Sequence, residues 1–226
     1  QPCAENNYAL TVNKVGMDLL SEVGAVNYLP RTMNARVAGG ITWTINDDDT
    51  VSTSGTASGE TWVQYASGLS IKEIEIPRNI YQIGDFAFSN CSSLLSVKIP
   101  HSVTTIGNYA FENCSSLTNV TIPESVTKIS NSAFSSCTAL KNITIPNSVI
   151  CIDQFAFNNC SALENVTIGE NVDSICASAF SYCSSLTSVT LPSKATKIGA
   201  NAFNGCKKLK TIKITSTKLS SKTVSK

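Results

Sequence analysis

Nine cysteines are the residues of this chain best suited to chemistry, because a thiolate can attack an electrophile, bind a soft metal or form a disulfide. Six of them recur at a constant step of 23 residues, each three positions after a phenylalanine: Cys91, Cys114, Cys137, Cys160, Cys183 and Cys206. Their place between Phe and Leu predicts an inward side chain, and buried free cysteine behaves as a small hydrophobe. Neighbouring units would bring these cysteines near disulfide range, but equivalent side chains in a stack run parallel. We therefore interpret the six as buried thiols without a catalytic role.

Two further cysteines depart from this pattern. Cys151 and Cys176 flank Ile152 and Ile175 on adjacent units, and we expect both side chains to point outward. Their diagonal offset makes a Cys151–Cys176 disulfide possible, with two free thiols as the alternative. Cys3 has no obvious partner.

Other residues that could support catalysis or metal binding are sparse. His101 is the single histidine, so no second imidazole exists for a metal site or a dyad, and we expect it to be exposed to water. Asp47, Asp48 and Asp49 carry charge suited to calcium, but the spacing of an EF-hand is absent, which favours a solvated turn. No phosphate-binding glycine loop, Gly-x-Ser-x-Gly elbow or zinc spacing occurs. We expect no enzymatic activity, no cofactor and no metal site.

The composition narrows the class of protein further. Charged residues make up 15% of the chain and the formal net charge is +1, which argues against a nucleic-acid partner. No apolar run approaches the roughly 18 residues of a transmembrane segment. The chain starts at Gln1 without a basic and apolar leader, which we interpret as the start of a processed or engineered mature chain. We expect a secreted, extracellular or cell-surface protein.

An internal repeat determines the expected architecture. The 23-residue step also links the Ala-Phe pairs from Ala87-Phe88 to Ala202-Phe203, and the Pro or Gly between the two apolar patterns of each unit, from Pro77 to Pro192. Six full units therefore occupy residues 77–214 without an insertion. A regular step of this length is typical of a solenoid.

Each unit contains two apolar patterns of the kind that form short strands. The first is Leu-x-x-Val-x-Ile, as in Leu117, Val120 and Ile122, in which β-branched residues two apart share one face of a strand. The second is Val-x-x-Ile, as in Val126 and Ile129. The stretch around Ala-Phe fits one tight helical or 3₁₀ turn. One unit alone would leave its apolar faces half exposed, so stacking of the units is required.

These recurring residues resemble a known family. The unit Leu-x-x-Val-x-Ile-Pro-x-Ser-Val-x-x-Ile-Gly-x-x-Ala-Phe-x-x-Cys-Ser-Ser resembles the 23-residue, treponemal-type leucine-rich repeat of BspA-like surface proteins, over residues 71–214. The resemblance implies a curved right-handed β-rich solenoid with short parallel strands, and adhesion to host or neighbouring-cell components. Ser130, Asp153 and Cys176 depart from the family pattern by replacing Gly, and Gly169 departs from it by replacing Pro.

The ends of the chain predict different elements. Residues 41–45 and 50–53 alternate apolar and polar positions around an Asp-rich turn, so we assign residues 39–70 to a β-hairpin cap. The spacing of Val15, Leu19, Val23 and Val26 predicts a short amphipathic helix within an N-terminal segment of residues 1–38. Residues 215–226 form a Lys/Ser/Thr-rich partial repeat or tail.

The candidate binding surface is the outward face of the Leu-x-x-Val-x-Ile strands. In a curved leucine-rich solenoid this sheet lines the concave side, where such proteins usually bind. The tentative ligand-binding residues are Asn119, Thr121, Asn142, Thr144, Asn165, Thr167 and Thr190. The alternative is that Thr and Asn merely pair across strands and keep the sheet soluble. An outer row of Phe86, Tyr109 and Phe155 is either packing between turns or a second contact site.

The sequence is compatible with three functions. The favoured one is a non-enzymatic recognition or adhesion module that binds a protein or glycan through the concave strand face. The second is a structural subunit that assembles head-to-tail into an extracellular fibre, a homo-oligomer in which one end of the array covers the next. Ice binding by the Thr ladder is a third idea, although curvature opposes a flat lattice match.

Overall fold

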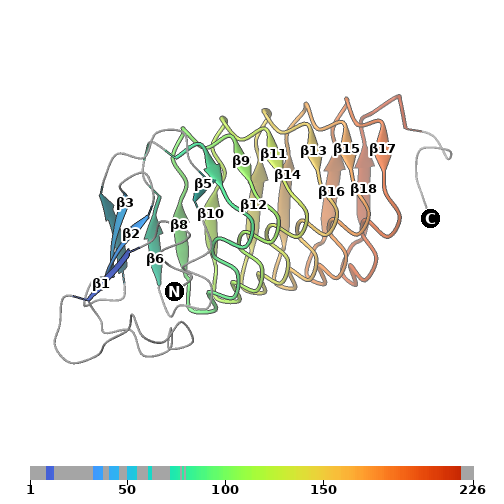
Figure 1. Ribbon diagram of the computed structural model, residues 1–226. Coiled ribbons are helices and arrows are strands. Elements are labelled where there is room, and N and C mark those ends of the chain that lie inside the picture. Colours follow the sequence, from blue (N-terminus) through green and yellow to red (C-terminus); the bar gives the residue numbers. More distant parts are fainter. Residues whose placement is uncertain are drawn as a thin grey trace.

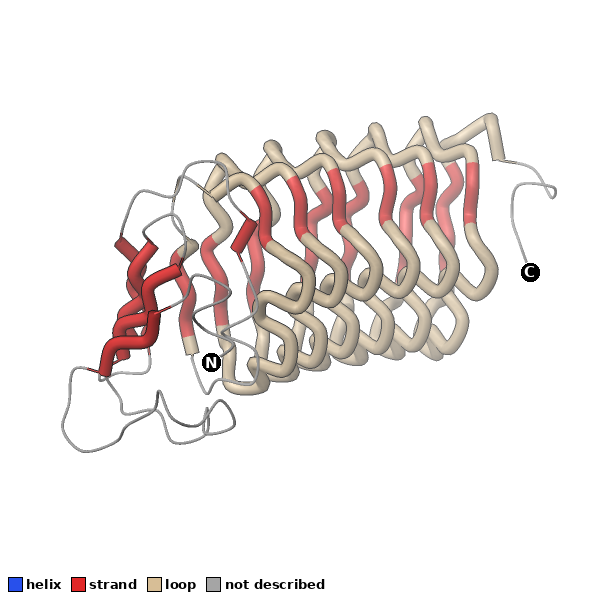
Figure 2. Tube along the Cα trace, viewed as in Figure 1, coloured by secondary structure: helices blue, strands red, loops and turns tan. Residues whose placement is uncertain are grey.

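The protein folds as a solenoid in which each 23-residue unit forms one coil, as Figure 1 shows. The strands of successive coils, called turns of the stack below, pair in parallel. The structure is a computed structural model and describes residues 9–12, 33–37, 41–45, 50–54, 61–62, 72–76, 78 and 80–219. Within these residues the chain contains two rows of short strands joined by turns, with no helix (Figure 2). The predicted repeat solenoid of leucine-rich type is therefore confirmed.

The first row of strands comes from the Leu-x-x-Val-x-Ile pattern, and its members run parallel. The row consists of β6 (Glu73–Glu75), β8 (Ser96–Lys98), β10 (Asn119–Thr121), β12 (Asn142–Ile145), β14 (Asn165–Ile168), β16 (Ser188–Leu191) and β18 (Thr211–Ile214). Hydrogen bonds divide the row into three sheets, β6-β8-β10, β12-β14 and β16-β18. These sheets follow one another along the stack, because β10 lies beside β12 and β14 lies beside β16. Partners such as Val120 and Val97 are 23 residues apart, so the sequence period is the period of the stack.

The second row comes from the Val-x-x-Ile pattern and forms one parallel sheet. Its strands are β5 (Thr61–Trp62), β7 (Gln82–Ile83), β9 (Thr105–Ile106), β11 (Lys128–Ile129), β13 (Cys151–Ile152), β15 (Ser174–Ile175) and β17 (Lys197–Ile198). From β7 to β17, each strand places its first residue toward solvent and an isoleucine into the core, as Lys128 and Ile129 do in β11. Figure 1 shows this row running beside the first along the whole stack.

Four antiparallel strands precede the stack. They are β1 (Ala9–Val12), β2 (Met33–Val37), β3 (Ile41–Ile45) and β4 (Thr50–Ser54), and β3 pairs with β4 with Ile45 opposite Val51. β4 also pairs in parallel with β6, so the first sheet continues from these strands into the stack. The amphipathic helix predicted around Val15 to Val26 lies outside the described residues, as do Asp47–Asp49 and residues 220–226.

The Ala-Phe segment forms the third side of each unit and is built from tight turns. Hydrogen bonds join residues three apart, as in Ser89 N–H to Phe86 O and Cys91 N–H to Phe88 O. Tight turns of this kind were expected around Ala-Phe, and they do not continue into a helix because two residues of each unit have φ between 54° and 74°. Backbone bonds also link equivalent turns, as in Phe88 N–H to Ala110 O at 2.7 Å.

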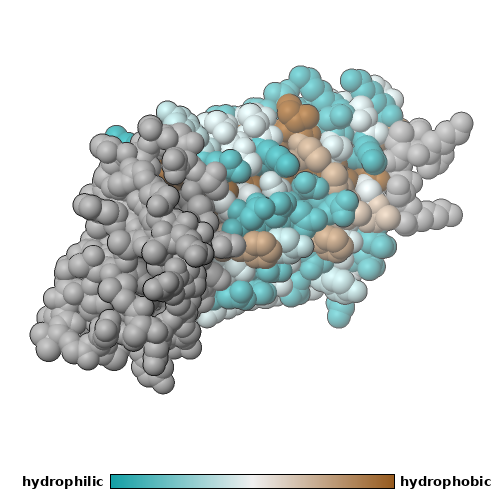
Figure 3. All heavy atoms as spheres, viewed as in Figure 1, coloured by the Kyte–Doolittle hydropathy of each residue, from teal (hydrophilic) through white to brown (hydrophobic). Residues whose placement is uncertain are grey.

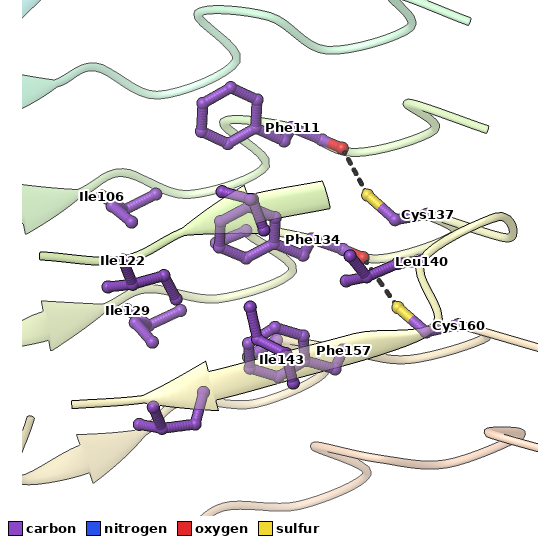
Figure 4. Close-up of a cluster of buried hydrophobic side chains, with 14 of the residues drawn as sticks. Ile106, Phe111, Ile122, Ile129, Phe134, Cys137, Leu140, Ile143, Phe157 and Cys160 are labelled. Atoms are coloured by element: carbon purple, nitrogen blue, oxygen red, sulfur yellow. Dashed lines mark hydrogen bonds between the residues drawn. The ribbon is translucent and has the colours of Figure 1, made fainter. Parts of the chain in front are cut away.

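The core contains the same side chains in every turn. Leu117, Val120 and Ile122 from the first row and Val126 and Ile129 from the second are buried, as the two apolar patterns predict. The phenylalanines of successive turns stack with ring centroids 5.2–5.6 Å apart and nearly parallel planes (Figure 4). A column of equal side chains fits this spacing because each ring fills the space directly above the previous one.

The outer surface of the described turns is mainly hydrophilic, with small hydrophobic patches, as Figure 3 shows for one face. The last described turn differs from the others. All four residues of β18 are exposed, including Ile212 at 43% and Ile214 at 58%, and Phe203 and Leu209 are only partly buried. The last described turn therefore leaves apolar side chains exposed, such as Ile212 and Ile214, at positions where Val189 and Leu191 of the preceding turn are buried.

Candidate functional site

The outward residues of the first strand row form what we call the polar strand face. It consists of two columns, Ser96, Asn119, Asn142, Asn165, Ser188 and Thr211, and Lys98, Thr121, Thr144, Thr167, Thr190 and Lys213. Because neighbouring residues of a strand point to opposite faces, the buried Val and Ile residues force these side chains outward. All seven residues predicted as ligand-binding lie on this face and are exposed.

Strand register brings the members of each column side by side. Asn142 lies opposite Asn165 and Thr144 lies opposite Thr167, so equal groups repeat at the inter-strand spacing of about 4.8 Å. The structure thus brings the predicted residues together as a regular array of amides and hydroxyls.

The hydrogen bonds within the polar strand face differ between its two columns. Asn165 Nδ2 donates to Asn142 Oδ1 at 2.8 Å, so these two amides partly pair with each other. By contrast, none of the hydroxyls of Thr121, Thr144, Thr167 and Thr190 has a protein partner among the described residues. Pairing across strands, the alternative to ligand binding, therefore accounts for the amides of Asn142 and Asn165 but not for the threonine hydroxyls.

Threonines on the other sides of the stack behave differently. The hydroxyl of Thr127 donates to Thr104 O at 3.3 Å, and the hydroxyl of Thr138 donates to Ser115 O at 3.2 Å. These side chains satisfy carbonyl groups of the preceding turn and hold the turns together. The threonine column of the polar strand face has no such structural role, which leaves its hydroxyls available to a ligand.

Charge on the polar strand face is confined to its ends. Lys98 lies beside Thr121 in β10, and Lys213 lies beside Thr190 in β16, whereas the columns between them are uncharged. A neutral array of hydroxyls and amides suits polar, uncharged groups such as sugar hydroxyls and peptide amides.

The repeated cysteines are buried thiols, as the sequence predicts. Cys91, Cys114, Cys137, Cys160 and Cys183 are fully buried, and Cys206 is partly buried in the last turn. From the second repeat on, each thiol donates to the carbonyl of the phenylalanine 26 residues earlier, such as Cys137 to Phe111 and Cys160 to Phe134 at 3.2 Å (Figure 4). Burial raises the pKa of the Cys160 thiol to about 12 and holds that of Cys137 well above its usual value. A thiol in this environment is a poor nucleophile.

The two off-pattern cysteines contact each other. The Sγ atoms of Cys151 and Cys176 are 3.5 Å apart, and both are thiols that are only partly buried. Burial raises the pKa of the Cys176 thiol to about 12, the neighbouring Cys151 and Asp153 add to the rise, and Lys197 opposes it. The predicted proximity of these two residues is present, although no disulfide joins them.

Of the remaining candidates, the structure describes His101 but not Asp47–Asp49. His101 lies exposed in a turn, as expected. In the part of the chain that the structure describes, no three His, Cys, Asp or Glu side chains are grouped so that they could hold a metal ion.

Sequence reasoning missed the backbone conformation of the outer aromatic row. Phe86, Tyr109 and Phe155 have φ of 55–58°, a left-handed conformation that is unusual for bulky residues, and Phe86 stacks on Tyr109 with centroids 4.7 Å apart. Phe86 and Phe155 are about two-fifths exposed, at 41% and 40%. Asn or Gly precedes four of the six repeated cysteines, as in Asn113 and Gly205, and is a sequence signal for the second left-handed position. Nothing in Phe or Tyr signals the first.

Comparison with known proteins identifies the family. The family described as "BspA type Leucine rich repeat region" matches residues 64–184 and 104–224, with six copies of the repeat. The chain belongs to this family of leucine-rich repeat proteins. Membership implies a protein-interaction or surface module.

Solved structures agree with this assignment. A leucine-rich cell-surface protein from Faecalibacterium prausnitzii A2-165 is 31% identical, with a TM-score of 0.62 over 80% of this chain and 54% of that one. The leucine-rich repeat protein TpLRR of T. pallidum is 28% identical, with a TM-score of 0.62 over 74% of this chain and 75% of that one. A leucine-rich repeat protein from Bacteroides ovatus ATCC 8483 is 29% identical, with a TM-score of 0.51 over 76% of this chain and 51% of that one.

The chain thus spans about half the length of the first and third of these proteins. Among curated protein sequences, none matches this chain. Within the described residues, no helix has the length and apolar character needed to cross a bilayer.

Proposed function

We propose that this protein is a non-enzymatic recognition module that binds a protein or glycan through the polar strand face, the face expected to be concave. The observation that carries the proposal is the column of threonine hydroxyls at Thr121, Thr144, Thr167 and Thr190, which are exposed and have no protein partner among the described residues. Several threonines elsewhere in the stack, such as Thr127 and Thr138, use their hydroxyls to join turns. The face therefore carries hydrogen-bonding groups that the fold itself does not use.

The regular spacing of these groups favours an extended ligand. Each hydrogen bond to a neutral hydroxyl or amide contributes only about 0.5–1.5 kcal/mol, so useful affinity requires contacts on several turns at once. A glycan chain or a protein surface can meet three or more hydroxyls spaced by about 4.8 Å, whereas a small molecule reaches only one or two. The rigid backbone ladder beneath the face limits the ordering cost of binding.

We further propose an extracellular or cell-surface location. The likeness to the F. prausnitzii cell-surface protein supports this placement, as does the Ser-, Thr- and Asn-rich surface. The ligand would then be a host or neighbouring-cell component.

The test removes hydroxyls without changing shape. Thr144→Val with Thr167→Val keeps β-branched side chains that favour a strand, and deletes two hydroxyls from the centre of the face. Binding to a panel of immobilised glycans and purified host-surface proteins is measured by surface plasmon resonance. We expect affinity for the ligands that bind the unmodified protein to fall by about 5- to 100-fold, the equivalent of two lost hydrogen bonds.

A matched control is available on another side of the stack. Thr104→Val with Thr127→Val deletes two exposed hydroxyls that bond to backbone carbonyls and lie away from the polar strand face. This double variant is expected to bind normally. Unchanged binding of Thr144→Val/Thr167→Val to every ligand would show that the face has been misassigned, and equal losses in both variants would do the same.

Head-to-tail assembly into a fibre is the second proposed function, and the last described turn is the observation that favours it. Ile212 and Ile214 are exposed there, next to the partly buried Phe203 and Leu209. A second copy could continue the stack over these side chains. Light scattering over a concentration series, followed by electron microscopy, tests this: growth in mass with concentration is expected, and a strict monomer at all concentrations rules it out.

A further inference from the structure

The contact between Cys151 and Cys176 is a chemical feature that the recognition function does not use. Cys151 is the outward residue of β13, and Cys176 directly follows β15, the neighbouring strand of the second row. Their Sγ atoms are 3.5 Å apart, and both side chains are partly exposed. Two reactive groups that touch at a partly exposed position form a site in their own right.

The repeat pattern shows that neither cysteine is required by the fold. Positions equivalent to Cys151 hold Gln82, Thr105, Lys128, Ser174 and Lys197, and positions equivalent to Cys176 hold Gly84, Gly107, Ser130, Asp153 and Gly199. Each thus occurs once in a column that otherwise contains no cysteine. They occur on adjacent turns at the diagonal offset that brings their sulfurs together.

We propose that Cys151 and Cys176 are an oxidation site at which a reversible disulfide joins two adjacent turns of the stack. The oxidant is an external disulfide, such as oxidised glutathione or a disulfide-exchange protein. One thiolate attacks it and releases one thiol, and the second cysteine sulfur then displaces the other thiol. Two protons and two electrons pass from the pair to the oxidant, and the Sγ–Sγ bond remains.

The geometry needs little change for this bond to form. A disulfide has an S–S length of about 2.05 Å, so the sulfurs must approach by about 1.5 Å, a movement that rotation of the two side chains can supply. The backbone is already fixed, because Cys176 N–H donates to Ile152 O at 2.9 Å. Oxidation therefore joins two strands that are already paired.

The core cysteines also have cysteines on adjacent turns, but their burial keeps them from reacting as Cys151 and Cys176 can. The thiols of Cys114, Cys137, Cys160 and Cys183 are fully buried and donate to backbone carbonyls, whereas Cys151 and Cys176 are partly exposed. Since exchange needs an accessible thiolate, these core thiols stay reduced while the stack is folded.

The surroundings of the pair affect the rate of its oxidation. Lys128 lies opposite Cys151 in the strand register, and Lys197 attracts the Cys176 thiolate, whereas Asp153 repels it. Both lysines also favour the approach of an acidic disulfide such as oxidised glutathione. Ile150, just before β13, is 51% exposed, and a hydrophobic patch near β13 is visible in Figure 3.

Such a bond would restrict the local opening of the middle of the stack. The two cysteines are 25 residues apart, and closing a loop of this length reduces the freedom of the opened state. We expect amide hydrogen exchange in β13 and β15 to slow by on the order of a hundredfold on oxidation. This effect is independent of whether the polar strand face binds a ligand.

The experiment uses the full chain with oxidised glutathione at pH 8, followed by alkylation of remaining thiols and peptide mass spectrometry. The expected result is a loss of two hydrogens and a linked peptide pair containing Cys151 and Cys176, with slower exchange in β13 and β15 that dithiothreitol reverses. Cys151→Ser and Cys176→Ser should each abolish the link. A Cys3→Ser/Cys206→Ser variant, which removes the partly buried Cys206 and the one cysteine outside the described residues, should retain it.

Three outcomes would overturn the proposal. The first is full alkylation of both cysteines after treatment with the oxidant. The second is a stable glutathione adduct on either residue without an internal link. The third is a link from either residue to Cys3 or to a second molecule.

Discussion

At the scale of single residues, the repeated cysteine is explained by packing and hydrogen bonding together. Its side chain is small enough for the space beside the phenylalanine column, and its thiol donates to a backbone carbonyl of the preceding turn, as Cys160 does to Phe134 O. Alanine would fill part of the same space but would leave that carbonyl without this donor. The cysteine column therefore links successive turns from within the core.

The raised pKa values of these thiols predict how stability depends on pH. The ordinary thiol pKa of 9.0 applies to the unfolded chain, and the folded pKa of Cys160 is about 12, so the unfolded chain ionises first as pH rises. This contribution to stability is complete below about pH 9 and is lost progressively between pH 9 and the folded pKa. We expect the free energy of unfolding to fall in this range, by up to about 1 kcal/mol per pH unit for each fully buried thiol.

Urea unfolding at pH 7.5, 9 and 10.5 checks this expectation. Because lysine and tyrosine residues also titrate at high pH, the measurement compares the unmodified protein with Cys160→Ala. The variant should be less stable at neutral pH but should lose stability less steeply above pH 9. Parallel pH profiles for the two proteins would contradict the assignment of this pH dependence to buried thiols.

At the scale of the elements, the strands follow directly from the apolar patterns, whereas the turns depend on close approach between neighbouring units. Gly107 follows β9 and lies against the equivalent turn of the preceding unit. A Cβ atom there would be 2.6 Å from the backbone C of Gly84 and 2.7 Å from the backbone N of Asp85. Neither backbone atom can move without displacing a turn.

Gly107→Ala is therefore expected to destabilise the protein by about 1–3 kcal/mol, because the two turns must separate to admit the methyl group. Urea unfolding measures the change. Ser130→Ala is the matched control, since Ser130 occupies the equivalent place one unit later and already has a Cβ atom. A Gly107→Ala variant as stable as the control would show that this contact is easily relaxed.

At the scale of the whole molecule, each turn of the stack contacts only the turns next to it. The free energy of local unfolding is therefore expected to vary along the axis of the stack. A central turn has neighbours on both sides, whereas β18 is exposed along its whole length. In such arrays unfolding begins at the least covered turns and proceeds inward.

Amide hydrogen exchange should reveal this gradient. We expect the amides of β12 and β14 to exchange at least tenfold more slowly than those of β18, because β12 and β14 have neighbouring strands on both sides, whereas β18 contacts β16 alone among the described strands. Peptide-resolved mass spectrometry under native conditions measures the rates, with the loss of all protection in denaturant as the reference. Equal protection from β8 to β18 would indicate that the stack opens as a single unit.

The sequence alone determined the period of the molecule and the inward or outward direction of most side chains. The 23-residue step predicted the register, because a repeat without insertions must stack in register. The side-chain directions followed from the apolar pairs Val120/Ile122 and Val126/Ile129, because alternation along a strand is a local property. The same reasoning placed Asn142, Thr144 and Thr167 on one exposed face and the cysteine column in the core.

Only the tertiary structure decided which of these groups have partners. The pairing of Asn142 with Asn165, the unpaired hydroxyl of Thr144 and the left-handed backbone of Phe155 depend on how neighbouring turns sit against each other. So does the 3.5 Å contact between Cys151 and Cys176, which the sequence permits as a diagonal offset but cannot establish. Sequence patterns specify the side of a strand on which a residue lies, whereas hydrogen bonds and sulfur contacts require atomic distances across turns that are far apart in the chain.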